Sequence, residues 1–194
     1  MLPILAGFIH CQRRRRLCLP TLPQGMEMQR PGRKRGTTLV TADPETRVYP
    51  LRPEDDAAWL PLWRGYQSFY QVDIPSAVSA STWARLLDPA EPVAGALAWN
   101  GTAAVGLVHH VRHRSCWTAG DYCYLQDLFV SPAFRGSGIG RKLIEHVYAE
   151  ASREGWARVY WLTHETNATA MRLYDRVAER SGFVQYRKNL WPGL

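Results

Sequence analysis

A glycine-rich run, Arg135-Gly136-Ser137-Gly138-Ile139-Gly140-Arg141-Lys142, is the part of the chain with the clearest chemical potential. Its three glycines let backbone N–H groups approach a ligand, because no Cβ stands in the way. The run lies between a strand-like segment, Tyr122 to Val130, and a helix-like segment, Arg141 to Glu154. A helix N-terminus carries about half a positive charge, so the sequence predicts a turn that holds a pyrophosphate.

The spacing of the glycines separates three kinds of glycine loop. A dinucleotide loop needs Gly-x-Gly-x-x-Gly, and here the third glycine comes one residue early. A P-loop needs Gly-Lys-Ser/Thr, but Arg141 precedes Lys142 and Leu143 follows it. Arg135, Gly138 and Gly140 fit the template Arg/Gln-x-x-Gly-x-Gly/Ala, which resembles the acetyl-CoA-binding motif of the GNAT acetyltransferase superfamily. Taken alone, the run is also compatible with a glycine turn that binds nothing.

The flanking segments strengthen this resemblance. The strand before the turn stops at Pro132, which cannot donate to a ladder, and Ala157 to Thr163 reads as a buried strand. Asn167 and Tyr174 are seven residues apart and therefore share one helix face. A further strand is expected after Gly182-Phe183. This order of features, from Arg47 to Lys188, is similar to the GNAT core.

The fold class expected from the order of the elements is α/β (mixed α+β), a GNAT fold whose central mixed, mostly antiparallel sheet is flanked by helices. Acids after Pro53 start a helix that runs to about Tyr70, and a second, short helix covers 81–87. Strands are expected over 48–52, 93–99, 102–111 and 122–130, with Asn100-Gly101 as a hairpin turn.

The resemblance also implies roles for individual residues. The N–H groups of the residues around the turn would hold acetyl-CoA; they are Arg135, Gly136, Ser137, Gly138, Ile139 and Gly140, and Arg141 would add a contact to phosphate. An N–H at Leu128 or Val130 would polarise the thioester carbonyl. Asn167 matches the residue that contacts the cofactor arm in relatives, and Tyr174 matches the general acid that protonates the CoA thiolate.

The general base is less evident, because Gln126-Asp127 stands where many relatives have Glu-Asp. Gln126 cannot accept a proton but can orient a water, whereas Asp127 can act as base. Side chains alternate along a strand, so only one of the two is expected to face the cleft. If Gln126 faces it, Asp127 is structural, and deprotonation needs a water chain, His164 or Glu165.

No metal site is predicted. His109 and His110 have no partners at a metal-like spacing, and one is expected to face the interior and the other solvent. Cys11, Cys18, Cys116 and Cys123 form no zinc-type pair, and Cys123 reads as a small core residue. Nothing requires an oxidising compartment, so a cytoplasmic location is expected.

The basic character of the chain belongs to its first 40 residues. The net charge is +7, and residues 1–40 contain eight Lys and Arg and one acid, Glu27. The remainder has 16 basic and 16 acidic residues, which disfavours binding to a nucleic-acid backbone. Residues 1–45 are expected to form a basic, disordered N-terminal extension, with a start of translation at Met26 or Met28 as an alternative, and 46–194 to form the acetyltransferase domain.

The function predicted is N-acetylation of a primary amine (a small molecule, a polyamine or a lysine-like amine) by direct attack on acetyl-CoA in a ternary complex. Leu173 to Ala178 resembles the branch with small polyamine and histone acetyltransferases, and Tyr66, Phe69 and Tyr70 form either an aromatic wall for a cation or core. A non-catalytic acyl-CoA sensor and a nucleic-acid-associated protein acting through the basic arm are the alternatives. The expected protein is a monomer or homodimer that contacts no membrane.

Overall fold

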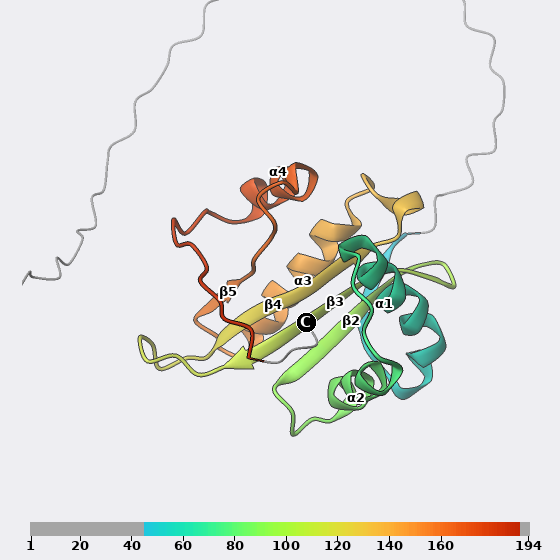
Figure 1. The fold of residues 1–194 in the computed structure, drawn as a ribbon, viewed down its shortest axis with the longest axis horizontal. Helices are drawn as coiled ribbons and strands as arrows, with labels where there is room; N and C mark the ends of the chain where they lie inside the picture. Colours follow the sequence, from blue (N-terminus) through green and yellow to red (C-terminus); the bar gives the residue numbers. More distant parts are fainter. Residues whose placement is uncertain (1–44, 191–194) are drawn as a thin grey trace, which may run out of the picture. The chain divides into compact units, whose positions relative to one another are not determined.

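Within the described part of the chain, the sheet has five strands in the order in which they occur along the chain, and Figure 1 shows their arrangement. A computed structural model describes residues 45–190. The strands are β1 (Arg47–Pro50), β2 (Val93–Asn100), β3 (Ala103–His113), β4 (Tyr122–Val130) and β5 (Arg158–Tyr160). The first four are antiparallel and β5 is parallel to β4, so the predicted mixed, mostly antiparallel sheet is confirmed. The predicted extension and the alternative start at Met26 or Met28 lie outside the described residues, and the division at residue 45 stays a prediction.

Helices cover both faces of the sheet. One face carries α1 (Asp56–Tyr70) and α2 (Ser76–Leu87), with a core of Trp59, Leu97, Leu107 and Phe129. The other face carries α3 (Ile139–Arg153) and α4 (Ala168–Val177), with a core that includes Val108, Cys123 and Leu143. Short 3-10 turns, η1 (Pro53–Asp55) and η2 (Pro132–Phe134), precede α1 and α3. Cys123 is fully buried, as predicted for a core residue.

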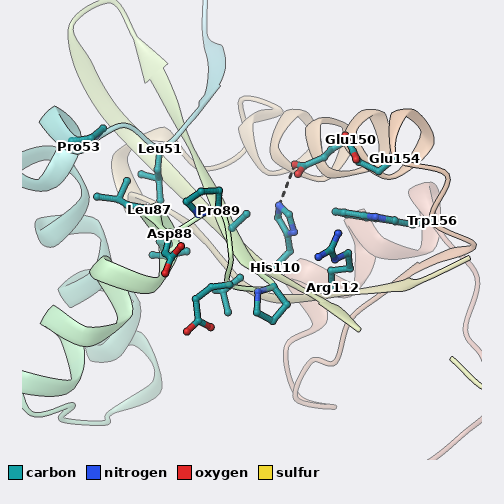
Figure 2. Close-up of a pocket in the computed structure, with 15 residues that line it drawn as sticks. Leu51, Pro53, Leu87, Asp88, Pro89, His110, Arg112, Glu150, Glu154 and Trp156 are labelled. Carbon is teal, nitrogen blue, oxygen red and sulfur yellow. Dashed lines mark ion pairs between the residues drawn. The ribbon is translucent and has the colours of Figure 1, made fainter. Parts of the chain in front are cut away.

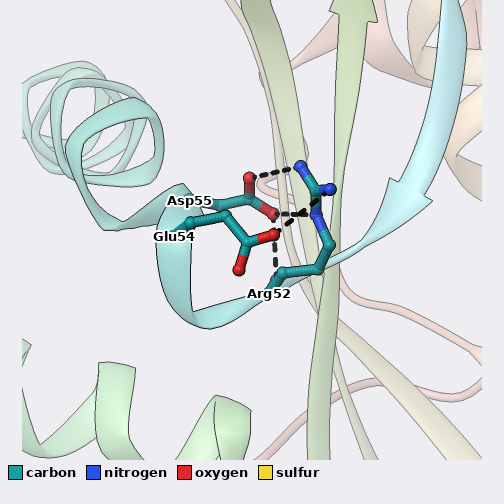
Figure 3. A network of polar contacts seen from close by, with 3 residues as sticks. All are labelled: Arg52, Glu54 and Asp55. Atoms are coloured by element: carbon teal, nitrogen blue, oxygen red, sulfur yellow. Dashed lines mark hydrogen bonds and ion pairs between the residues drawn. The ribbon is translucent and has the colours of Figure 1, made fainter.

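A polar cluster fixes the start of α1 (Figure 3). The backbone N–H of Arg52 donates to Asp55 Oδ2 at 2.9 Å, and its guanidinium donates to Asp55 Oδ1 at 3.0 Å. Glu54 adds a second carboxylate 3.3 Å from the same guanidinium. Because the carboxylate of Asp55 is buried, these partners are what makes its burial tolerable. The cluster thereby closes the η1 turn that precedes α1.

Three expectations about the elements need correction. The second helix begins at Ser76, five residues early, where Ser79 Oγ accepts a hydrogen bond from Trp63 Nε1 at 3.1 Å. β5 ends at Tyr160 rather than at Thr163. The strand expected after Gly182-Phe183 is absent: residues 181–190 are irregular and exposed, and Phe183 is 83% exposed. A strand needs a partner for its N–H and C=O groups, and none of the described strands pairs with this segment.

A β-bulge interrupts β4 at Gln126. His109 pairs with Asp127 while the next residue, His110, pairs with Leu125, so Gln126 is an extra residue without a partner on β3. The extra residue reverses the alternation of faces along β4. As a consequence Asp127 lies on the α1 face, together with Tyr66 and Phe129, instead of sharing a face with Leu125.

Candidate active site

A cavity of about 550 Å³ opens at the glycine turn. It is lined by the end of β4, the turn, the N-terminus of α3, one face of α4 and the last residues of α1. Ten of the predicted site residues line it: Leu128, Val130, Arg135, Gly136, Gly138, Ile139, Gly140, Arg141, Asn167 and Tyr174. The structure therefore brings together the residues that sequence reasoning selected from two separate segments. Ser137, Gln126 and Asp127 do not line it.

The glycine turn forms a cradle. Gly136 and Gly138 have φ angles of +83° and +86°, and a Cβ built on either would meet no atom within 4 Å. The first bond of α3 runs from Lys142 N to Gly138 O, so the N–H groups of Ile139, Gly140 and Arg141 precede the helical ladder. Free N–H groups at a helix N-terminus, with open space in front of them, suit a pyrophosphate. Ser137 Oγ donates instead to Phe134 O at 2.6 Å, which holds the turn.

Arg135 connects the cradle to the neighbouring elements. Its Nε donates to Val130 O at 3.0 Å, and its guanidinium lies 5.4 Å from the ring centre of Phe69 and 5.7 Å from that of Phe129. Such contacts between a cation and aromatic rings are attractive. The side chain of Arg135 thus ties the end of α1 to the end of β4.

The backbone of β4 presents free edge groups to the cavity. Ser131 N donates to Val105 O, and hydrogen-bonded pairs alternate along an antiparallel ladder. By that alternation the N–H groups of Leu128 and Val130 point away from β3. β5 pairs with β4 only as far as Tyr124, so these N–H groups face the opening between the two strands. They are oriented to bind an extended ligand arm as an added strand would.

Asn167 and Tyr174 both belong to α4. Asn167 caps the helix, since its Oδ1 accepts from Ala170 N at 3.4 Å and its Nδ2 donates to Thr163 Oγ1 at 3.3 Å. Tyr174 is half-buried, and its ring stands edge-on to Trp161 at 5.3 Å. Burial, followed by the nearby Tyr70, raises the pKa of Tyr174 to about 12. Its hydroxyl therefore keeps its proton at neutral pH.

Asp127 and Gln126 lie in different surroundings. Gln126, at the bulge, is exposed, whereas Asp127 is buried with Oδ2 3.1 Å from His109 Nδ1. The hydroxyl of Tyr66 lies near Asp127, and burial followed by the charge of Asp127 raises the pKa of this tyrosine. The alternative bases His164 and Glu165 are exposed and do not line the cavity.

The expectation for the two histidines was wrong. His109 and His110 are 3% and 2% exposed, so both are buried. They do point to opposite faces of β3, but β3 is an inner strand and helices cover both faces. His110 Nε2 lies 3.2 Å from Glu150 of α3, and Figure 2 shows this pair beside Trp156. It lines a second cavity, of about 370 Å³, that shares no lining residue with the first.

Sequence reasoning missed the residues behind Asp127. Trp59 Nε1 donates to His109 Nε2 at 2.9 Å, so Trp59, His109 and Asp127 form a hydrogen-bonded series across α1, β3 and β4. No motif connects positions so far apart in the chain. A pairing register for β3 and β4 with the bulge in place is the signal that would have revealed it. Among residues 45–190, no group of three or more His, Cys, Asp or Glu is placed to hold a metal, and no helix is long and apolar enough to cross a membrane.

Comparison with known proteins identifies the family. Residues 58–178 match the sequence profile described as the acetyltransferase (GNAT) family. The chain is 38% identical over 144 residues to the D-amino-acid N-acetyltransferase HPA3 of Saccharomyces cerevisiae, a match that covers 73% of this chain and 89% of that protein. The chain belongs to the GNAT acetyltransferase family.

This GNAT protein is accordingly an N-acetyltransferase, an enzyme that acylates an amino group. It is also 32% identical over 85 residues to the thialysine N-epsilon-acetyltransferase of Caenorhabditis elegans, where the match covers 44% of this chain and about half (52%) of that protein. An aminoglycoside N-acetyltransferase solved with CoA shares the fold, with a TM-score of 0.68 at 16% identity over 79% of this chain and 100% of that chain. At this level of identity the match shows the shared fold.

Proposed function

We propose that this protein transfers acetyl from acetyl-CoA to a small primary amine, by direct attack of the amine in a ternary complex. The observation that carries the proposal is that the glycine cradle, the open edge of β4 and the hydroxyl-bearing Tyr174 line one cavity. A cradle for pyrophosphate, N–H groups for a thioester carbonyl and a proton donor are the groups that this reaction needs. They occur here within reach of a single ligand.

The cradle supports acetyl-CoA as the donor of this chain. The open space in front of Gly136 and Gly138, the N–H groups of Ile139 and Gly140 and the guanidinium of Arg141 suit the pyrophosphate. The edge N–H groups of Leu128 and Val130 suit the thioester arm and its carbonyl oxygen. Asn167, which begins α4 at the wall of the cavity, is placed to contact the same arm.

In the reaction proposed, the amine nitrogen forms a bond to the thioester carbon and the carbon–sulfur bond breaks. The hydroxyl of Tyr174, which its raised pKa keeps protonated, acts as the general acid by donating a hydrogen bond to the departing thiolate. The ammonium of the acceptor must first lose a proton. We assign Asp127 to the attraction of that ammonium and to its deprotonation, with Gln126 as the residue that orients a water at the exposed bulge.

The relatives point to amino acids and lysine-like amines as acceptors. Their names specify D-amino acids and thialysine, each of which combines an amine with a carboxylate. Arg172 and Arg176 line the cavity on α4 and offer cations for such a carboxylate. Phe69 and Tyr70 line it on the end of α1, where an aromatic wall suits the ammonium.

A panel of acceptors tests the proposal. D-amino acids, L-lysine analogues, polyamines and simple alkylamines are incubated with the full chain and acetyl-CoA, and release of free thiol is followed. We expect saturable turnover with at least one amino acid or lysine-like amine. Binding of CoA without turnover of any amine would instead support the sensor alternative, and absence of CoA binding would refute the cradle assignment.

We further propose that the enzyme acts in the cytoplasm as a monomer or homodimer, without a membrane or nucleic-acid partner. The described cysteines, Cys116 and Cys123, are both free, which agrees with a reducing compartment. Burial, together with the charge of Glu150, raises the pKa of the Cys123 thiol to about 12, so this thiol is inert as a nucleophile.

A further inference from the structure

The series Trp59–His109–Asp127 fixes which nitrogen of His109 carries the proton. An indole N–H can only donate, and it points at His109 Nε2 from 2.9 Å. Nε2 must therefore accept, with its lone pair free. The proton of the neutral ring then lies on Nδ1, which donates to Asp127 Oδ2 at 3.1 Å. In a doubly protonated ring, the N–H at Nε2 would point at the indole N–H of Trp59, and neither group could accept a hydrogen bond.

This arrangement decides the charge of the pair. A protonated His109 beside Asp127 would form an ion pair with no net charge. With a neutral imidazole, His109 donates a hydrogen bond to Asp127 but supplies no positive charge to neutralise its carboxylate. The contact between His109 and Asp127 is therefore a hydrogen bond from a neutral donor and not a salt bridge.

The surroundings of the series are built to keep it in place. Trp59 is 1% exposed and His109 is 3% exposed. Gly95 of β2 lies opposite His109 in the ladder, and a Cβ there would come within 2.9 Å of His109 Cδ2. The ring centre of Trp63 lies 5.4 Å from that of the imidazole. His109 is therefore confined to one orientation.

Asp127 lies close to three tyrosines, one of which lines the cavity. Asp127 acts electrostatically on three tyrosines, Tyr66, Tyr70 and Tyr124. Of these, Tyr70 also lines the cavity and lies close enough to act on Tyr174. Tyrosine rings around a buried carboxylate form an environment that attracts an ammonium group.

We propose that Trp59 and His109 are positioning residues, which hold Asp127 as an unneutralised carboxylate so that the acceptor's ammonium binds beside Tyr66 and Tyr70. Neither residue touches the substrate, and each acts through Asp127. The expected effect on catalysis rests on the proposed function. The protonation state of His109 follows from its hydrogen bonds and does not depend on that function.

Nitrogen-15 NMR of the full chain tests the protonation state directly. Histidine-labelled protein at pH 7 should show His109 as a neutral ring with the proton on Nδ1. In Trp59→Phe, which removes the indole N–H, Asp127 still holds the proton on Nδ1, but Nε2 is free to bind a second proton, and a doubly protonated ring should be detected. A wild-type His109 with its proton on Nε2, or on both nitrogens, would overturn the inference, and this readout needs no activity.

Kinetics test the consequence, with a matched control on the same strand. His109→Leu removes the donor to Asp127, and KM for the amine should rise about 10- to 100-fold, as expected for the loss of a charge-assisted hydrogen bond. KM for acetyl-CoA should stay within about twofold. His109→Asn keeps an N–H at the position of Nδ1 and should recover most of the loss. His110→Leu alters an equally buried histidine on the opposite face and should leave KM for the amine within about twofold.

The outcomes separate this inference from the proposed function. Equal changes in KM for the amine in His109→Leu and His110→Leu would show that His109 is merely structural. Absence of turnover by the wild type with every amine would refute the proposed function, while the NMR result would still decide the state of His109. If His109→Leu does not fold, Trp59→Phe takes its place in the kinetic comparison.

Discussion

Replacement of Tyr174 by Phe tests the assigned proton donor. The variant keeps the ring that stands edge-on to Trp161 at 5.3 Å and removes only the hydroxyl. We therefore expect the free energy of unfolding to change by less than about 1 kcal/mol, since the packing is preserved. KM for acetyl-CoA should stay within about twofold, because the cradle does not include the hydroxyl. The effect should be confined to kcat.

The size of the effect follows from the pKa of Tyr174, which is raised to about 12. A thiol has an ordinary pKa of about 8.5, so complete transfer of the phenolic proton to a free thiolate is uphill by about 3.5 pKa units, or about 5 kcal/mol. The hydroxyl then acts mainly as a hydrogen-bond donor to the developing thiolate, and such a bond contributes about 1.5–3 kcal/mol. We expect kcat to fall about 10- to 100-fold.

The assay is steady-state release of free thiol, with a second tyrosine as control. Tyr148 also lies near Trp161, but its hydroxyl donates to Val177 O at 3.0 Å. Tyr148→Phe should lower stability by about 1 kcal/mol and leave kcat within about twofold. Because Tyr174 acts while protonated, wild-type kcat should lose no activity through this group until the pH exceeds about 11. An unchanged kcat in Tyr174→Phe would refute the role, and a fall of about 10⁴-fold would refute the hydrogen-bond argument.

Two further predictions concern the cradle and the opposite face of the sheet. Gly138→Ala should raise KM for acetyl-CoA at least about tenfold, because the added Cβ enters the space proposed for the ligand. The control Gly155→Ala lies outside the cavity at a similar φ of +70° and should lower stability by a comparable amount without changing KM. Isothermal titration with CoA measures affinity and thermal unfolding measures stability, and equal losses of affinity in the two variants would count against the cradle. Glu150→Gln should destabilise the fold at pH 7 by about 1–3 kcal/mol, because His110 holds the pKa of Glu150 below its usual 4.5. This stabilisation is present above pH 4.5 and is lost as the pH falls through the lower pKa of the folded state, so the free energies of unfolding of wild type and variant should converge in acid. A difference in free energy of unfolding that does not change with pH in denaturant titrations would contradict this account.

Local signals in the sequence were sufficient for much of the fold and for the position of the glycine turn. The glycine turn, the limits of β4 and the seven-residue spacing from Asn167 to Tyr174 depend on contacts within or next to one element. Helical and strand periodicity reports such contacts directly. The segment after Gly182-Phe183 shows the limit, because its residues favour a strand but only a neighbouring strand can complete one.

The residue pattern of the chain was therefore enough for the family, for the glycine turn before α3, for the helix that carries Tyr174 and for a mostly antiparallel sheet. The surroundings of Asp127 follow only from the tertiary structure. Simple alternation assigns Gln126 and Asp127 to opposite faces but does not reveal the bulge that puts Asp127 on the α1 face. The partners Trp59 and His109 come from two other elements and meet Asp127 only because α1 packs across β3 and β4. A local pattern cannot specify such a site, since its hydrogen bonds join positions 18 and 50 residues apart.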